Sequence, residues 1–130
     1  MRQDRSAFAR PDDELLVDET VIEQLASITD GQGFSVLGEL LNAFLGAVPG
    51  RLEALDRAAA GGDLHAVADQ AHSLTGSAAS FGARGMAALC RQLRAVADEG
   101  DADTARYLVG ELQAEFLRVR AWLVSFRSRV

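Results

Sequence analysis

The side chains best suited to chemistry in this 130-residue chain are its two histidines, His65 and His72. An unprotonated imidazole offers a nucleophilic lone pair near neutral pH and is also a common metal ligand. Both histidines fall within one predicted helix, seven residues apart, so they share a face but lie about 10 Å from each other along the axis. One metal ion cannot span that distance, so a metal site would need ligands from other helices. We therefore expect no metal on this chain.

His72 lies in surroundings that break a local rule of helix composition. It follows Ala71, an expected inward position, so it should stand at the edge of the buried stripe. Gly76 comes one turn later, although glycine in mid-helix costs about 1 kcal/mol relative to alanine. The missing side chain leaves the imidazole uncovered, and the nearby residues are also small: Ser73, Ser77, Ala79 and Ser80. Two interpretations stay open: a docking point for another protein, or an inert surface histidine beside a glycine that permits close helix packing.

The composition excludes several other functions. The chain has 13 basic residues against 19 acidic ones and a formal net charge of −6, which argues against a general nucleic-acid binder. Every basic residue is an arginine, so lysine-dependent chemistry, such as a Schiff base, is excluded. A single cysteine, Cys90, rules out an internal disulfide and a cysteine metal cluster. No apolar run approaches the ~18 residues of a membrane span, and no signal peptide is recognisable, so we expect a soluble, cytoplasmic protein.

Turn signals divide the chain into a flexible N-terminal arm, residues 1–16, and one helical domain, residues 17–130. Asp18, Asp63 and Asp101 are suitable N-caps, and glycines follow the expected helix ends. Between these signals, apolar residues recur every three or four positions, which predicts helices with one buried stripe each. The predicted helices cover residues 18–29, 34–60, 63–81, 83–97 and 102–126.

The composition and the lengths of these segments favour one topology. Abundant alanine and leucine, together with scarce strand formers, favour an all-α fold. Connections of one to three residues join the four long helices, and such short loops force neighbouring helices to run antiparallel. We therefore predict an antiparallel up-down four-helix bundle with a short extra N-terminal helix that covers one end. Pro49, inside the first long helix, is expected to kink it.

Residues 71–83, AHSLTGSAASFGA, resemble the motif of histidine-containing phosphotransfer (HPt) domains. That motif typically reads His-x-Leu-Lys-Gly-Ser/Ala, followed by a few small residues and Gly-Ala. The similarity extends over residues 18–126 and includes the segment from Phe44 to Leu55, the pair Gly62-Asp63, the segment from Leu89 to Leu93 and the final long helix. The resemblance implies a helical bundle that serves as a phosphorelay intermediate and is not an enzyme.

By its position in this motif, His72 is the residue that accepts and donates the phosphoryl group. The resemblance implies that the group comes from a receiver-domain aspartate or a histidine kinase and passes to a receiver domain. The expected partners are therefore a response-regulator receiver domain, a hybrid histidine kinase, or both, and neither nucleic acid nor a membrane. Mg²⁺ would belong to the receiver, so this chain, which we expect to be a monomer, needs no cofactor of its own. The receiver-docking surface would comprise Gly76, Ser73, Ser77, Ala79 and Ser80.

Two positions depart from the family pattern. Thr75 stands three residues after the histidine, where the family usually carries a lysine that helps to neutralise the phosphoryl group. Arg94 occupies a position on the facing helix where relatives often carry a Glu or Gln that accepts a hydrogen bond from the imidazole, which arginine cannot do. We hypothesise that Arg94 supports the phosphoryl site as its cation, with Arg91 and Arg84 as weaker candidates and with Thr75 offering a hydroxyl.

Two alternatives to this hypothesis stay open. Arg94 can instead point to solvent and pair with a surface carboxylate. The loss of both usual partners can also mark a bundle that no longer carries phosphate. In that case the chain would be an adaptor or inhibitor that binds a receiver or a kinase without phosphotransfer.

The remaining residues of interest have structural interpretations. Cys90 lies on an inward stripe and should be a small buried residue. His65 should be a solvated surface side chain, and Trp122 should belong to the core or its rim. Four arginines near the end of the last helix should offset the helix dipole rather than bind nucleic acid: Arg118, Arg120, Arg127 and Arg129.

Overall fold

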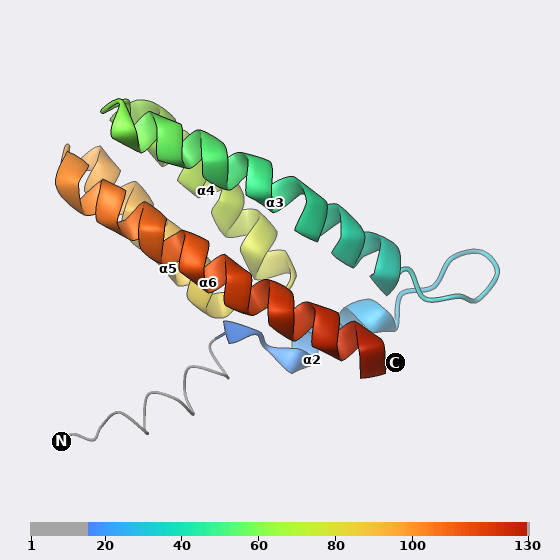
Figure 1. Ribbon diagram of the computed structural model, residues 1–130. Helices are drawn as coiled ribbons and strands as arrows, with labels where there is room; N and C mark the ends of the chain where they lie inside the picture. The colour runs from blue at the N-terminus through green and yellow to red at the C-terminus, as the bar shows by residue number, and fades with distance from the viewer. Residues whose placement is uncertain (1–15, 130) are drawn as a thin grey trace, which may run out of the picture.

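The computed structural model describes residues 16–129, and within them it contains five α-helices. The helices are α2 (Glu19–Ala26), α3 (Leu37–Ala60), α4 (Leu64–Ser80), α5 (Arg84–Asp98) and α6 (Ala102–Arg129). The four long helices run side by side, and α2 lies across the end where α3 begins and α6 ends (Figure 1). Residues 1–15 of the predicted arm lie outside the described residues. Leu16, the last residue of that predicted arm, is 5% exposed and belongs to the core.

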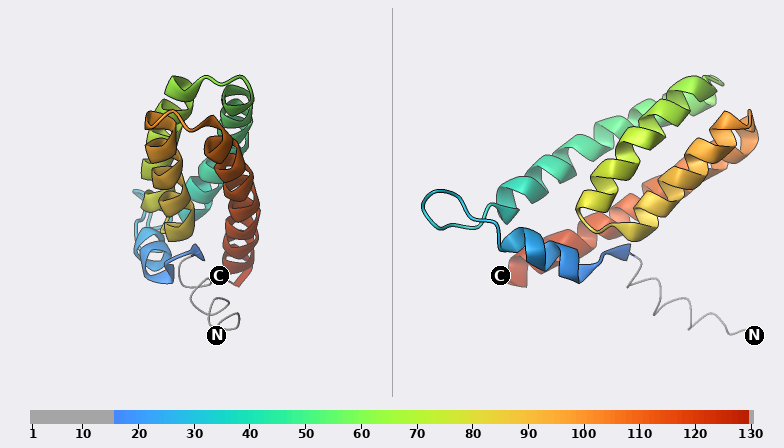
Figure 2. Two further views of the ribbon diagram at one scale, coloured as in Figure 1. Left: turned by 90° about the vertical axis from the view of Figure 1, so that its left-hand side faces the viewer. Right: turned by 180° about the vertical axis from the view of Figure 1, so that it is seen from behind.

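The chain closes into a four-helix bundle because each long helix packs against the next and α6 packs back against α3 (Figure 2). Three-residue turns, at residues 61–63, 81–83 and 99–101, join α3, α4, α5 and α6. Such short turns leave no room for a crossover, so consecutive helices run antiparallel. The predicted all-α up-down bundle with a short extra helix is therefore confirmed.

Aspartates begin three of the helices, as the sequence predicts. The carboxylates of Asp18, Asp63 and Asp101 accept hydrogen bonds from backbone amides in the first turns of α2, α4 and α6, at 3.0, 3.2 and 3.1 Å. Each bond satisfies an N–H group that has no partner within its helix. Hydrogen bonds from the side chain and backbone of Thr104 lower the pKa of Asp101.

The core is formed by one apolar stripe from each long helix, with Ile22 of α2 at its end. No polar or charged residue is buried within the described part of the chain. Helix α3 continues through Pro49 without interruption. The stripes include Leu41, Phe44, Val48, Leu52 and Leu55 of α3; Val67, Ala71, Leu74 and Ala78 of α4; Met86, Cys90 and Leu93 of α5; and Leu108, Leu112, Phe116, Val119 and Leu123 of α6.

The segment between α2 and α3 differs from the prediction. Helix α2 ends at Ala26 rather than at residue 29, and α3 begins at Leu37 rather than at residue 34. The backbone amide of Asp30 donates to the carbonyl of Phe34 (2.8 Å), and its carboxylate accepts from the amides of Gln32 (2.8 Å) and Phe34 (3.0 Å). These bonds satisfy the backbone in a closed turn, so the helices need not extend into it. At the other end of the chain, α6 continues past the predicted Phe126.

Gly82, between α4 and α5, is the point at which α2 meets the bundle. Its φ of +70° lies in the left-handed region, and its carbonyl accepts a hydrogen bond from the amide of Asp18 (2.7 Å). A Cβ at this position would lie 2.9 Å from the carbonyl oxygen of Asp18 and 3.0 Å from the Cβ of Val21. Glycine is therefore required both by the turn and by the close approach of α2.

Gly82→Ala should lower the free energy of unfolding by about 2–4 kcal/mol, because it adds left-handed strain and a clash with Asp18. Gly100→Ala is the matched control, since Gly100 also has a positive φ (+81°) but nothing lies within 4 Å of its added Cβ. We expect the control to lose about 1 kcal/mol from backbone strain alone. Urea denaturation followed by circular dichroism measures both values. Equal losses in the two variants would contradict the close approach.

Cys90 lies on the inward stripe of α5, as predicted, and is a buried free thiol. Burial raises its pKa from 9.0 to about 12, although the charge of Arg91 partly opposes the shift. The thiolate is the reactive form, so the folded protein should not react with a disulfide reagent at mildly alkaline pH until it unfolds. Labelling rates in native buffer and in urea measure this protection. A native rate close to the rate in urea would show that the thiol is reachable in the folded bundle.

Candidate functional site

His72 stands on the outer surface of α4, next to α5. The buried residues Ala71 and Leu74 fix which face of α4 turns inward, and His72 is exposed beside them. The second histidine, His65, is also exposed, and its Nε2 lies 3.5 Å from a carboxylate oxygen of Asp69. His65 is thus a surface residue, as expected. Of the two imidazoles, only His72 is contacted by a side chain from another helix.

That contact comes from Arg94 of α5, whose Nη1 lies 2.7 Å from Nδ1 of His72. The Nε of Arg94 also lies 4.0 Å from a carboxylate oxygen of Asp98, one turn later on α5. The arginine side chain is about half exposed (49%), so solvent screens the ion pair and makes it weak. Arg94 thus combines two alternatives raised by the sequence, a position next to the histidine and pairing with a surface carboxylate.

Thr75 lies beside this pair but directs its hydroxyl elsewhere. Its Oγ1 donates to the backbone carbonyl of Ala71 (2.8 Å), and the side chain is half-buried. Ser80 makes the same kind of bond, from its Oγ to the carbonyl of Gly76 (2.9 Å). Both hydroxyl protons are thus used within α4, and only their lone pairs remain available to a visiting group.

The residues of α4 that follow His72 on its exposed surface have small side chains. A Cβ built on Gly76 would meet nothing within 4 Å, so this glycine is not needed for close packing between helices. That observation removes one of the two interpretations of Gly76. Of the other small residues, Ser77 is half-buried at the margin, and the following are exposed: Ser73, Ala79 and Ser80. Another protein surface can therefore approach the imidazole closely.

A second arginine, Arg51 of α3, reaches this face from the opposite side, and our sequence analysis missed it. Its Nη1 donates to Oγ of Ser73 (2.6 Å), the neighbour of His72. A pocket of about 420 Å³ lies here between α3 and α4. Arg51 and Ser73 each stand 11 residues from Gly62, at the centre of the α3–α4 turn, so an antiparallel pairing places them level. That count is the sequence signal that predicts the contact.

The two weaker arginine candidates do not join the His72 cluster. Arg84 lies 3.7 Å from a carboxylate oxygen of Asp18 and so binds α2 to the start of α5. Arg91 is exposed on α5, one turn before Arg94. Trp122 is half-buried and stacks on Phe126, with 5.4 Å between ring centroids, as expected for a residue at the rim of the core.

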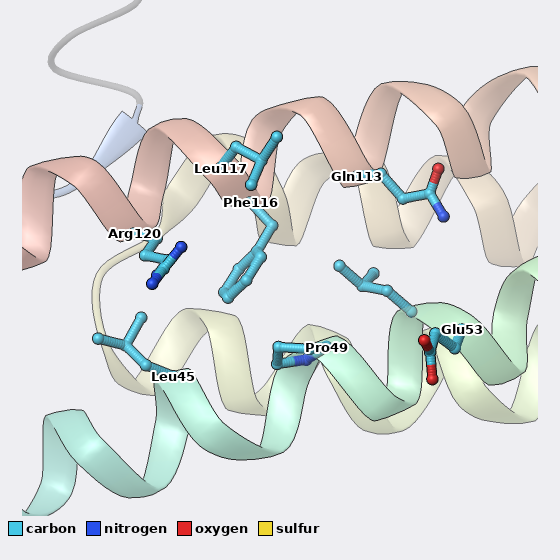
Figure 3. A pocket seen from close by; sticks show the side chains of 8 residues that line it. Leu45, Pro49, Glu53, Gln113, Phe116, Leu117 and Arg120 are labelled. Carbon is cyan, nitrogen blue, oxygen red and sulfur yellow. The ribbon is translucent and has the colours of Figure 1, made fainter.

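A separate pocket of about 530 Å³ lies between α3 and α6 and contains none of the predicted site residues. Its lining is mainly apolar, with Phe116 of α6 directed toward Pro49 of α3 (Figure 3). Glu53 and Arg120 are the charged residues at its edge. It offers no nucleophile, so the candidate site remains the one at His72.

Among helices of residues 16–129, none is long and apolar enough to span a membrane. Within the same residues, no three His, Cys, Asp or Glu side chains are grouped so that they could hold a metal ion.

Comparison with known proteins gives two findings. Residues 39–122 match the family model of the Hpt domain. The fold resembles the crystal structure of histidine-containing phosphotransfer protein B from Pseudomonas aeruginosa PAO1, with a TM-score of 0.80 and 28% sequence identity. That similarity covers 88% of this chain and 96% of the other. No curated protein matches the chain significantly.

Proposed function

The chain belongs to the Hpt domain family, and we propose that His72 is the residue on which it carries a phosphoryl group. Members of the family are histidine phosphotransfer shuttles of phosphorelays rather than enzymes. The observation that supports His72 most directly is its exposure on a rigid helix, with the guanidinium of Arg94 at 2.7 Å from its ring. A nucleophile, a cation and an open approach thus meet at one point.

The proposed reaction needs little from this chain beyond a placed imidazole. A ring nitrogen of His72 attacks the phosphorus of an aspartyl phosphate on a receiver, and an N–P bond forms from its lone pair. The bond between phosphorus and the carboxylate oxygen breaks, and the aspartate leaves as a carboxylate with that electron pair. Mg²⁺ on the receiver neutralises the phosphoryl oxygens during transfer. The reverse reaction delivers the group to the next receiver, and a histidine kinase is an alternative donor.

Arg94 is the proposed cation of the phosphoryl site, in place of the family's lysine. A guanidinium is always protonated and can donate two parallel hydrogen bonds to phosphoryl oxygens. Because Arg94 already contacts the ring, a small rotation brings it to a group attached there. We give Thr75 a minor part, since its hydroxyl proton is directed to the carbonyl of Ala71.

The receiver-docking surface that we propose is the small-residue surface of α4 that follows His72. It comprises Gly76 with the serines and the alanine around it: Ser73, Ser77, Ala79 and Ser80. Arg51 and Arg94 stand on its two sides and present positive charge to the acidic pocket of a receiver, which favours association. The cytoplasmic location and the monomeric state stay predictions, as does the choice between a receiver and a hybrid kinase as partner.

The adaptor or inhibitor remains the alternative, motivated by the missing lysine. It shares the docking surface with the first proposal but assigns no reaction to His72. Phosphate transfer and binding must therefore be measured separately.

Incubation with phosphorylated receiver domains from the same genome should label the wild-type protein with acid-labile, alkali-stable phosphate. His72→Gln should remain unlabelled because it loses the nucleophile. His65→Gln is the matched control and should be labelled like the wild type, since His65 lies apart from the site. Binding of a receiver without labelling of the wild-type chain would instead support the adaptor.

Gly76→Leu should slow transfer from the receiver about tenfold or more, because a misplacement of ~1 Å can cost ~10²-fold in rate. The added side chain points into open space, so the helix content should not change. Gly110→Leu is the control: Gly110 is also an exposed glycine within a helix, with nothing within 4 Å of its added Cβ, but it lies on α6. Stopped-flow or quench assays of phosphate transfer compare the two. Transfer by Gly76→Leu at the control rate would exclude this face as the docking surface.

A further inference from the structure

Arg94 does more at the site than supply charge, because its contact determines which ring nitrogen of His72 is free. We propose that Arg94 holds the unphosphorylated His72 in the tautomer with its proton on Nε2, and that it must move before Nε2 can take a phosphoryl group. This inference rests on the proposed function. It makes Arg94 a positioning residue whose guanidinium occupies two places in turn: first at Nδ1 of His72, and then at the phosphoryl oxygens.

The first step follows from the donor inventory of the two side chains. A guanidinium has five N–H donors and no acceptor, so at 2.7 Å the Nδ1 atom of His72 must be the acceptor. A doubly protonated ring would place two donors face to face at that distance. The ring in this contact is therefore neutral, with its lone pair on Nδ1 and its proton on Nε2.

The second step concerns the side from which a partner arrives. Nδ1 is bonded to the ring carbon that carries Cβ and faces Arg94, whereas Nε2 is on the far side of the ring. His72 is exposed, and Gly76 leaves the space next to it open, so an incoming phosphorus meets Nε2 first. In the contact with Arg94 that nitrogen bears a proton and has no lone pair to donate. The resting site is therefore exposed but not yet reactive.

The third step concerns the freedom of the Arg94 guanidinium to move away from the ring. Its Nε lies 4.0 Å from the carboxylate of Asp98, and both side chains are largely exposed, at 49% and 62%. A screened pair at that distance does not immobilise the guanidinium. A dianionic phosphoryl group attracts a guanidinium more strongly than a neutral ring nitrogen does. An arriving phosphoryl group can therefore draw Arg94 away from Nδ1.

The proton balance of the step is then complete. When Arg94 leaves, solvent water takes the proton from Nε2, and Nδ1 gains one from solvent. The lone pair now on Nε2 forms the N–P bond, and the receiver aspartate departs as a carboxylate. Arg94 ends on the phosphoryl oxygens, where it supplies the charge that the missing lysine does not.

Two uncharged variants test the tautomer directly. Arg94→Met keeps a linear side chain without any hydrogen-bonding donor, and Arg94→Gln adds an amide oxygen that can accept a hydrogen bond from Nδ1–H. Nuclear magnetic resonance shifts of the ring nitrogens, in unphosphorylated protein with isotope-labelled histidine and a neutral ring, report the tautomer. We expect an Nε2–H ring in the wild type, a mixture in Arg94→Met and a majority of Nδ1–H in Arg94→Gln. Arg91→Met, the control one turn earlier on α5, should keep the wild-type shifts.

Transfer rates give the second readout. Both variants lack the charge, but only Arg94→Gln favours a free Nε2, so it should accept phosphate severalfold faster than Arg94→Met. Equal rates in the two variants, unchanged ring shifts in Arg94→Met, or a phosphoryl group on Nδ1 would each overturn the inference. Failure of the proposed function looks different, because the wild type and both variants would then take no phosphate from a receiver. The ring shifts of the unphosphorylated protein are measured independently of that result.

Discussion

The alignment of α4 with the helices on either side depends on two short turns. Residues 61–63 and 81–83 each reverse the chain within three residues, and a glycine with positive φ lies in both, Gly62 at +75° and Gly82 at +70°. Turns of this length allow little sliding between neighbouring helices. They therefore determine which residues of α3 and α5 stand level with His72, and the chemistry of the site follows from that alignment.

One consequence is that arginines from both neighbouring helices contact α4 at His72 and Ser73, although the chain has no lysine. Arg51 contacts the adjacent Ser73 from α3, and Arg94 contacts the ring from α5. A lysine on α4 itself would put a charge next to the histidine without restricting the ring. An arginine on a facing helix contacts Nδ1 as well, so in the mechanism that we propose the exchange of residue types couples charge to tautomer. Of the two departures from the family pattern, Arg94 contacts the ring and Thr75 bonds to the backbone of α4.

The sequence predicts the scaffold better than the side-chain contacts. Periodic apolar residues and the three aspartate caps yield the helices and the bundle, because burial and capping act on local patterns. The exposure of His72 also follows from its place beside Ala71. In contrast, the turn after α2 depends on two bonds to one Asp30 oxygen, which no periodicity reveals. The sequence does not determine the partner of Arg94, because a long, flexible side chain can reach several partners from one backbone position. Apolar periodicity does not reveal the contact of Arg51, although counting outward from Gly62 predicts it.

Gly82 and Ala83 end the stretch that resembles the family motif, yet their surroundings are architectural. The carbonyl of Gly82 accepts a hydrogen bond from the amide of Asp18, and Ala83 is fully buried. This stretch therefore has two structurally distinct parts, one around His72 and one at the turn between α4 and α5. In this chain, Gly82 and Ala83 join α2 to the bundle. The positions of Thr75 and Arg94 distinguish a bundle whose cation would lie on the histidine's own helix from this one, in which it lies on the facing helix.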